Sequence, residues 1–172
     1  AGTAEADFAS CLVWSSRPGN ELPVLIIVTN NQWGISTAAK GQHGETQISD
    51  RGRAFNIRSK TIDGNDPENA YRELQEAFEY VRRERKPFLL EAMVSRLYGH
   101  SSASGANMTT EELDCLAEFE TSLEARGIMT RQQMDDVRTG WSEKIAAMAR
   151  EVREEPLPAP ETIWNHIFFE RG

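Results

Sequence analysis

The sequence contains little cysteine and no long apolar run. Its 172 residues include only two cysteines, Cys11 and Cys115. Both stand in apolar, helix-like contexts, which predicts buried free thiols and a reducing compartment. The longest apolar stretch is shorter than the about 20 residues that a helix needs to cross a bilayer. The sequence therefore indicates no membrane span.

Positive charge is also scarce. Lysine and arginine number 19 against 27 aspartate and glutamate residues, which leaves a net charge of −8 and a pI near 5.0. This balance argues against a nucleic-acid surface and a polybasic membrane anchor. The sequence lacks an internal repeat, a zinc-type ligand spacing and a visible Ser-His-Asp arrangement. It starts on alanine with no signal or transit composition.

The stretch from Pro23 to Ser36 carries the strongest pattern. Residues Val24 to Thr29 are apolar or β-branched, which predicts a parallel-sheet strand buried on both faces. The run ends at Asn30-Asn31, where two amides serve no purpose in a core but suit the ligand-binding carboxyl edge of a sheet. Because amide oxygens are hard neutral ligands for Mg²⁺, Asn31 and the Trp33 carbonyl are candidate metal ligands. A plain strand-end turn is the alternative.

Further elements are predicted along the first two thirds of the chain. Helices are expected over 4–17, 48–55 and 67–86, strands over 57–62 and 88–94, and a polar loop over 36–47. Buried strands alternating with helices are typical of an α/β fold with a parallel, doubly wound sheet. Right-handed crossovers then bring Asn30-Asn31, Asp63-Gly64 and the segment after Val94 to one edge of the sheet.

The last third of the sequence is helical in pattern. Helices are predicted over 110–126, from a Thr130 cap to before Pro156, and over 161–169. The middle helix has one apolar face, made of Met134, Val137, Trp141, Ile145, Met148 and Val152. We expect an α/β domain over 1–108 and a helical extension over 109–172, which packs on that domain or on a partner subunit.

A second group of functional residue types follows the 88–94 strand. The segment Arg96 to Asn107 combines a cation, an imidazole, several hydroxyls and two glycines, and such a loop at a ligand edge is a site candidate. The imidazole of His100 suits holding a substrate carboxylate or moving a proton near neutral pH. The alternative is a histidine that only caps the loop. His43 and His166 are assigned no role.

Four motifs resemble the E1 α-subunit family of 2-oxoacid dehydrogenases, which act on pyruvate or branched-chain 2-oxo acids. Three are Thr-Asn-Asn-Gln-Trp-Gly-Ile-Ser at 29–36, Asp-Gly-Asn-Asp at 63–66 and Tyr-Gly-His-Ser-Ser at 98–102. The fourth is the opening, in which Asn31 follows Ala1 by 30 residues. It resembles the second half of the thiamine-diphosphate motif Gly-Asp-Gly…Asn-Asn, with Ala1 on the last glycine of the triplet.

The resemblance implies a pyrophosphate-binding fold with two cofactors, thiamine diphosphate and Mg²⁺. The metal would bridge the diphosphate to Asn31 and the Trp33 carbonyl, and Ala1 and Gly2 would offer backbone to the diphosphate. His100 would face the thiazolium end of the cofactor as the catalytic histidine. Ser101 falls on the serine that is phosphorylated in mitochondrial members.

The resemblance also implies the activity and the partners. The reaction would be oxidative decarboxylation of a 2-oxo acid, with acyl transfer to the lipoyl group of an E2 acyltransferase. A β-type subunit or fused domain would complete the site, so this chain is expected to be an inert fragment alone. The compartment would be the bacterial cytoplasm or, in a eukaryote, the mitochondrial matrix.

Two alternatives stay open at this point. One is another thiamine-diphosphate enzyme, an acetoin dehydrogenase or a transketolase-like protein. The other is a non-catalytic module that binds a partner. The sequence also departs from the family after Ser101, where Ser-Ala-Ser-Gly-Ala-Asn stands without the usual acidic residues and Tyr-Arg. This departure bears on loop ordering and on phosphorylation control.

Overall fold

The structure is a computed structural model that describes residues 2–101 and 111–168. Contacts divide the chain into two units, Ala1–Ser122 and Leu123–Gly172, which we describe separately. The domain boundary expected at 108/109 lies outside the described residues and stays a prediction.

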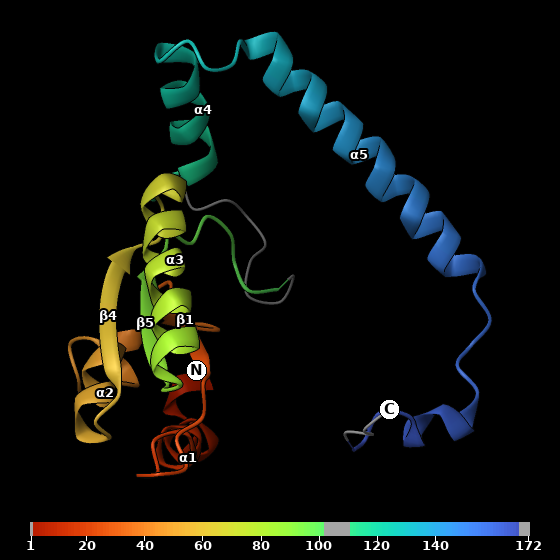
Figure 1. Ribbon diagram of the computed structural model, residues 1–172. Coiled ribbons are helices and arrows are strands. Elements are labelled where there is room, and N and C mark those ends of the chain that lie inside the picture. Colours follow the sequence, from red (N-terminus) through yellow and green to blue (C-terminus); the bar gives the residue numbers. More distant parts are fainter. Residues whose placement is uncertain (1, 102–110, 169–172) are drawn as a thin grey trace. The chain divides into compact units, whose positions relative to one another are not determined.

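A three-stranded parallel sheet forms the centre of the first unit. Its order is β1 (Leu25–Asn30), β5 (Phe88–Met93) and β4 (Arg58–Asp63), and the strands lie side by side in Figure 1. Both outer strands end opposite the same residue, because Asn30 and Asp63 each pair with Met93. The predicted α/β fold with a parallel sheet is confirmed, and its strands end together as expected.

Helices cover the two faces of the sheet. Helix α3 (Pro67–Glu84) lies along one face (Figure 1), where its Ala77 and Val81 pack with alternate residues of β5: Phe88, Leu90 and Ala92. On the other face, Leu12 of helix α1 (Ala6–Ser15) and Ile48 of the 3₁₀ turn η3 (Ile48–Asp50) pack on Leu89. Successive strand residues point to opposite faces, so β5 supplies both cores.

Local chemistry explains where α3 begins. The Asp66 side chain accepts hydrogen bonds from the backbone N–H groups of Glu68, at 2.9 Å, and Asn69, at 3.1 Å. Pro67 occupies the first helical position, where a missing N–H costs nothing. Asp66 is thus the N-cap of the helix that the sequence predicts over 67–86.

Two burial predictions are wrong. Strand β1 is not buried on both faces, because Ile27 is 48% exposed. The strand lies at the edge of the described sheet, paired only with β5. Cys11 is exposed and Cys115 partly buried, and both are free thiols. Helix α1 buries Leu12 and Ser15, and Cys11 is rotated away from that face.

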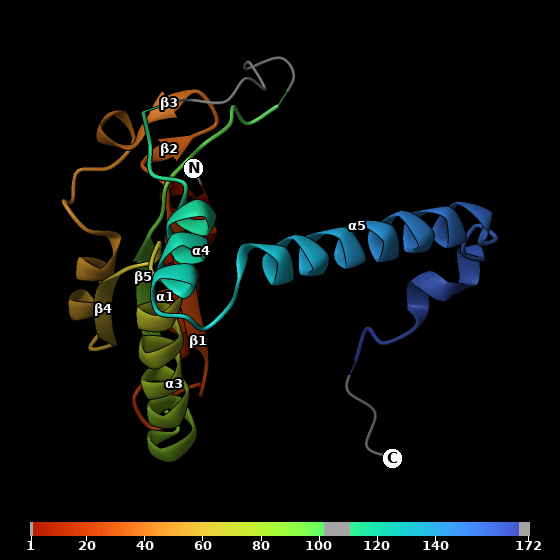
Figure 2. The ribbon, with the colours of Figure 1, turned by 90° about the horizontal axis from the view of Figure 1, so that it is seen from above.

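A short hairpin follows β1 and reverses the chain. It consists of β2 (Trp33–Gly34) and β3 (Thr37–Ala38), and Figure 2 shows it beyond the end of the sheet. The turns η2 (Ala39–Gly41) and η3 and the short helix α2 (Arg51–Ala54) then lead into β4. Part of the predicted loop 36–47 is therefore a strand, and the predicted short helix over 48–55 is confirmed as η3 and α2.

Helix α4 (Cys115–Ala125) starts later than predicted. The Asp114 side chain caps it by accepting a hydrogen bond from the Leu116 N–H at 3.0 Å. Leu116 is 55% exposed.

The second unit contains α5 (Arg131–Glu154) and the 3₁₀ helix η5 (Pro160–Trp164). Thr130 caps α5, as predicted, and the cap is a capping box with Gln133. Of the predicted apolar face of α5 only Met134 is buried, and its other members, from Val137 to Val152, are 52–62% exposed. Among the described residues, no helix is both long enough and apolar enough to span a membrane.

Candidate functional site

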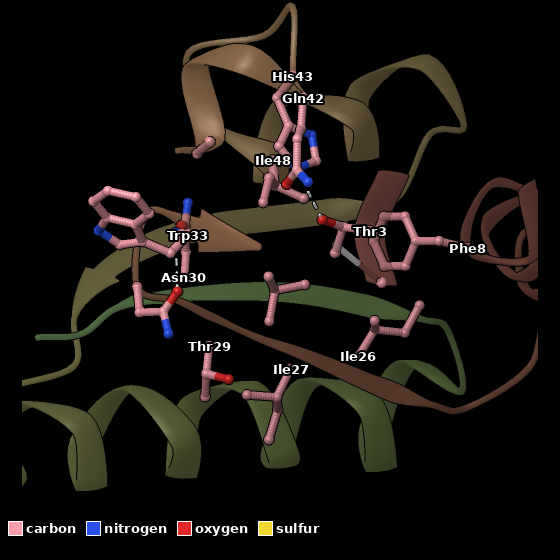
Figure 3. Close-up of a pocket in the computed structure, with 14 residues that line it drawn as sticks. Thr3, Phe8, Ile26, Ile27, Thr29, Asn30, Trp33, Gln42, His43 and Ile48 are labelled. Carbon is pink, nitrogen blue, oxygen red and sulfur yellow. Dashed lines mark hydrogen bonds between the residues drawn. The ribbon is translucent and has the colours of Figure 1, made fainter. Parts of the chain in front are cut away.

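A cavity of about 350 Å³ lies beside β1 and its carboxyl end. Figure 3 shows Thr3 and Phe8 on one side, Asn30 and Trp33 on the other, and Gln42 and His43 reaching in from a third segment. These residues come from the start of the chain, from the turn after β1 and from the stretch after the β2–β3 hairpin. The cavity thus joins segments far apart in sequence, since Thr3 and His43 are separated by 40 residues.

The turn after β1 presents Asn31 and Trp33 together. The Asn31 side-chain oxygen accepts a hydrogen bond from the Trp33 backbone N–H at 3.0 Å, which fixes both residues in one tight turn. Asn31 is partly buried and lines the cavity with Trp33 and Gly2. The structure therefore brings together three of the predicted site residues: Gly2, Asn31 and Trp33.

Asn30 has a different role from Asn31. It is only 8% exposed, and its Nδ2 donates to Oε1 of Glu91 at 2.6 Å. Its Oδ1 accepts from the backbone N–H and from the side-chain Nε2 of Gln32, each at 2.9 Å. The expectation that neither amide serves the core is wrong for Asn30, since this side chain satisfies a buried carboxylate.

Glu91 is fully buried in the middle of the sheet, at 0% exposure. Burial alone would raise the pKa of its carboxyl. Hydrogen bonds from Asn30, from the backbone N–H groups of Ser49 and Ile48, and from the Thr61 hydroxyl outweigh burial and hold the pKa below its usual value. The carboxylate is therefore ionised at neutral pH, and its donors among these residues are neutral.

A cluster of charged and polar groups closes the cavity beside Thr3. The Thr3 hydroxyl lies 3.4 Å from Nε2 of His43, and Nδ1 of His43 lies 3.2 Å from Oε1 of Glu45. The Arg51 guanidinium contacts the same Glu45 oxygen at 2.6 Å and donates to the Thr3 backbone carbonyl. These contacts pin the segment that begins at Gly2 to the segment that follows the hairpin.

The charge on Glu45 follows from this cluster. Partial burial would raise the pKa of its carboxyl, but its own backbone N–H and the Arg51 guanidinium bring the pKa below its usual value. Arg51 also lies over the Phe8 ring, with its Cζ 5.6 Å from the ring centre. The cation is thus held between the Glu45 carboxylate and the ring of the cavity residue Phe8.

Gln42 contributes an unused acceptor. Its Oε1 is buried and has no hydrogen-bond partner within the described part of the chain. Buried acceptors of this kind are normally satisfied in the working protein. Three oxygens near the turn, Asn31 Oδ1, Gln42 Oε1 and the Trp33 backbone carbonyl, thus belong to residues that line the cavity.

The segment after β5 runs past the hairpin. Arg96 donates from Nη1 to the Ile35 backbone carbonyl at 2.6 Å, and its Cζ lies 5.6 Å from the centre of the Trp33 ring. The backbone N–H of Arg96 donates to Glu112. His100 and Ser101 follow on this segment as exposed residues, and neither lines the cavity. Ala1 lies outside the described residues.

The Asp-Gly-Asn-Asp motif serves the fold. A Cβ on Gly64 would lie 2.8 Å from Cγ1 of Val94 and 2.9 Å from Cβ of Ala92, so only glycine fits there without a shift. Asn65 exchanges two hydrogen bonds with Ser95, at 2.9 and 3.1 Å. The motif thereby fixes the start of the segment that carries Arg96 and His100.

Sequence reasoning missed His43, Arg51 and Glu91. His43 lay in a stretch read as a polar loop, and only the hairpin at 33–38 folds that stretch back onto the start of the chain. Glu91 had one signal, a single acidic residue in an apolar strand. No group of three or more His, Cys, Asp or Glu side chains suited to a metal occurs in the described residues.

Comparison with known proteins places these features in a family. The sequence profile of the dehydrogenase E1 component family matches residues 1–161. The chain is 29% identical to the mitochondrial 2-oxoisovalerate dehydrogenase subunit alpha 2 of Arabidopsis thaliana, over 97% of this chain and 37% of that protein. It is 27% identical to the pyruvate dehydrogenase E1 component subunit alpha of Rickettsia prowazekii, over 86% of this chain and 47% of that one.

A third relative has a different name. It is a putative 2-dehydropantoate 2-reductase of Arabidopsis thaliana, 31% identical over 93% of this chain and 44% of its own length. The chain thus spans less than half the length of each of the three relatives. The names of relatives leave the reaction open, but the profile match extends over most of the chain. The chain therefore belongs to the dehydrogenase E1 component family, as the motifs around Asn31 and His100 predict.

Proposed function

We propose that this chain is part of the α-type subunit of a thiamine-diphosphate-dependent 2-oxoacid dehydrogenase. The whole protein oxidatively decarboxylates a 2-oxo acid, pyruvate or a branched-chain 2-oxo acid, and passes the acyl group to the lipoyl group of an E2 acyltransferase. The observation that supports this most is the cavity that joins Gly2 to Asn31 and Trp33 at the end of β1. Carboxyl ends of parallel strands are where α/β sheets bind ligands.

The residues of the cavity fit a metal-bound diphosphate. Asn31 Oδ1 and the Trp33 carbonyl are hard, neutral oxygens suited to Mg²⁺, which takes its remaining ligands from phosphate and water. The backbone of Ala1 and Gly2 would face the diphosphate, and the Arg51 cation lies behind Thr3. Thiamine diphosphate, when bound, supplies the carbanion chemistry of decarboxylation, and the protein supplies position and electrostatics.

His100 is proposed to act on the substrate side. Arg96 fixes the segment against the hairpin, and His100 follows four residues later as an exposed side chain. Its imidazole would hold the substrate carboxylate or donate a proton during acyl transfer to the lipoyl group. Ser101 is the proposed phosphorylation site. A phosphate there would add about two negative charges beside His100 and repel a carboxylate substrate.

The proposed partners are a β-type subunit or domain and the E2 acyltransferase. The exposed apolar face of α5 includes Trp141, Ile145 and Met148. It supports burial against such a partner, because a helix face that stays in water normally carries polar residues. The proposed compartment is the bacterial cytoplasm or the mitochondrial matrix. An acetoin dehydrogenase or transketolase-like enzyme would use the same cofactor residues.

A nicotinamide-dependent reductase, as one relative's name suggests, is less well supported. Such enzymes hold the dinucleotide on a Gly-x-Gly-x-x-Gly turn between a strand and a helix. This chain contains no such spacing of glycines, and β1 ends at Asn30 and is followed by Asn31 in its place.

The test uses the complete α-type polypeptide assembled with its β-type partner. We expect decarboxylation of a 2-oxo acid that requires thiamine diphosphate and Mg²⁺. Asn31→Ala should weaken Mg²⁺ binding, while Asn20→Ala, in an exposed loop, should not. Parent-like Mg²⁺ and cofactor binding in Asn31→Ala would contradict the assignment. Activity on sugar phosphates in place of 2-oxo acids would favour the transketolase-like alternative.

A further inference from the structure

A charge at the centre of the sheet is unexplained by packing. Glu91 is 0% exposed, between Leu90 and Ala92 on the middle strand. Removing a carboxylate from water is expensive, and an apolar side chain of similar volume is often as stable or more so. The position of Glu91 therefore calls for a role that an apolar residue could not fill.

One carboxylate oxygen of Glu91 orients the turn after β1. Oε1 accepts from Asn30 Nδ2 at 2.6 Å, which directs Asn30 Oδ1 toward Gln32. There Oδ1 accepts both Gln32 donors at 2.9 Å. Gln32 has φ of 63°, a left-handed conformation that a non-glycine residue adopts only when its surroundings hold it. Asn31 lies between these two fixed residues, so Glu91 determines the turn that presents Asn31 and Trp33.

The other carboxylate oxygen holds the opposite wall. Oε2 accepts from the Ser49 backbone N–H at 2.9 Å and from the Thr61 hydroxyl at 3.1 Å. Ser49 belongs to η3, which begins at the cavity residue Ile48 and follows the segment of Gln42 and His43. The Glu91 carboxylate thus connects two segments that line the cavity: the turn after β1 and the segment that leads into η3.

We infer that Glu91 is a positioning residue for the metal half-site, acting through Asn30 and Gln32 on Asn31 and the Trp33 carbonyl. The inference rests on the proposed function, since it concerns the same Mg²⁺ and thiamine-diphosphate site. Residues that orient metal ligands without touching the metal commonly cost 10–100-fold in metal affinity when changed.

Two single variants break this contact in different ways. Glu91→Gln leaves one oxygen for donors on two sides, so its Nε2 meets either Asn30 Nδ2 or the Ser49 N–H. Where it meets Asn30, two donors face each other and Asn30 must turn its oxygen away from Gln32. Asn30→Asp places two carboxylates in contact. We expect each variant, in the complete protein with its β-type partner, to raise the Mg²⁺ concentration for half-maximal activity by about 10–100-fold.

The double variant Glu91→Gln/Asn30→Asp should restore every hydrogen bond. Only the contact between positions 91 and 30 changes, because its donor and acceptor are exchanged. The amide introduced at position 91 would donate to the carboxylate introduced at position 30, and its oxygen would accept from Ser49 and Thr61. The new carboxylate would still accept from Gln32, and the total charge is unchanged. We expect the Mg²⁺ requirement to return to within about threefold of the parent. Calorimetry of Mn²⁺ binding in the presence of thiamine diphosphate should likewise show weaker binding in the two single variants than in the parent and the double variant.

Thr61→Val is the matched control. It removes one donor from Glu91 without touching Asn30 or Gln32, and Thr61 does not line the cavity. It should lower thermal stability but leave the Mg²⁺ requirement nearly unchanged. If Glu91→Gln fails to fold, Asn30→Asp and the double variant carry the same comparison.

Three outcomes would overturn the inference: a parental Mg²⁺ requirement in both single variants, no recovery in the double variant, or a loss in Thr61→Val equal to that in Glu91→Gln. A parent protein that needs no Mg²⁺ would instead contradict the proposed function itself. The Mg²⁺ requirement of the parent therefore distinguishes a failure of this inference from a failure of the proposed function.

Discussion

Gly64→Ala is expected to destabilise the first unit for purely steric reasons. A Cβ at this position would lie 2.8 Å from Val94 Cγ1, 2.9 Å from Ala92 Cβ and 3.0 Å from the Met93 carbonyl oxygen. Optimal contacts between carbon atoms are about 3.5–4.0 Å, so β5 or the turn after β4 must move. Overpacking of this kind typically costs about 1–3 kcal/mol. For a chain of this size, that corresponds to a fall in melting temperature of roughly 2–12 °C.

Gly44→Ala is the matched control. Nothing lies within 4 Å of a Cβ built on Gly44, and its φ is not in the left-handed region. The extra methyl group restricts the unfolded chain more than the folded one, so the change should stabilise by up to about 1 kcal/mol.

Thermal and urea unfolding of the two variants beside the parent provide the measurement. The steric argument predicts opposite signs for the same chemical change. Equal melting temperatures for Gly64→Ala and Gly44→Ala would refute it, because the close approach of β4 and β5 at Gly64 would then be absent in solution.

Three further outcomes are expected. His100→Ala in the complete enzyme should lower kcat by about 10²–10⁴-fold, with cofactor affinity far less changed, and stopped-flow rates of decarboxylation and lipoyl acylation would test it. Trp141→Asp on the exposed face of α5 should prevent assembly with the β-type partner, measured by ultracentrifugation, whereas Glu143→Gln should not. The pKa of Glu91 is lowered in the folded state, so its stabilising effect is present above the ordinary carboxyl pKa of about 4.3 and is lost as the pH falls through the lowered value. Urea unfolding should show a shallower acid limb for Glu91→Gln, and an unchanged limb would contradict this.

The sequence predicted the elements whose cause is local. The Asp66 side chain caps α3, Thr130 caps α5, and a short apolar run interrupted only by Glu91 marks β5, because each of these signals lies within a few neighbouring residues. The order of the strands, in contrast, depends on pairing between segments that are distant in sequence. Nothing near Ile27 in the sequence indicates that β1 lies at the edge of the described sheet, so its burial was overestimated.

The site was predictable only in part for the same reason. The turn containing Asn31 and Trp33 follows from one continuous stretch of sequence, and the structure presents both residues to one cavity. The cluster of Thr3, His43 and Arg51 requires the β2–β3 hairpin to reverse the chain over the correct distance. Hairpin geometry of this kind depends on φ angles such as 56° at Ile35, where sequence preference points elsewhere.

The pair Asn30-Asn31 shows how the fold divides identical side chains. Asn30 is the last residue of β1 and stands opposite Met93, so its side chain is still directed by the pleat, and it turns inward to Glu91. Asn31 has left the strand, and its side chain bonds its own turn at Trp33. A shift of the strand by one residue would exchange the two amides, because successive side chains point to opposite faces. The buried Glu91 carboxylate accepts a hydrogen bond only from the amide nitrogen that reaches it. This contact therefore fixes the register of β1 at the point where the proposed metal ligands begin.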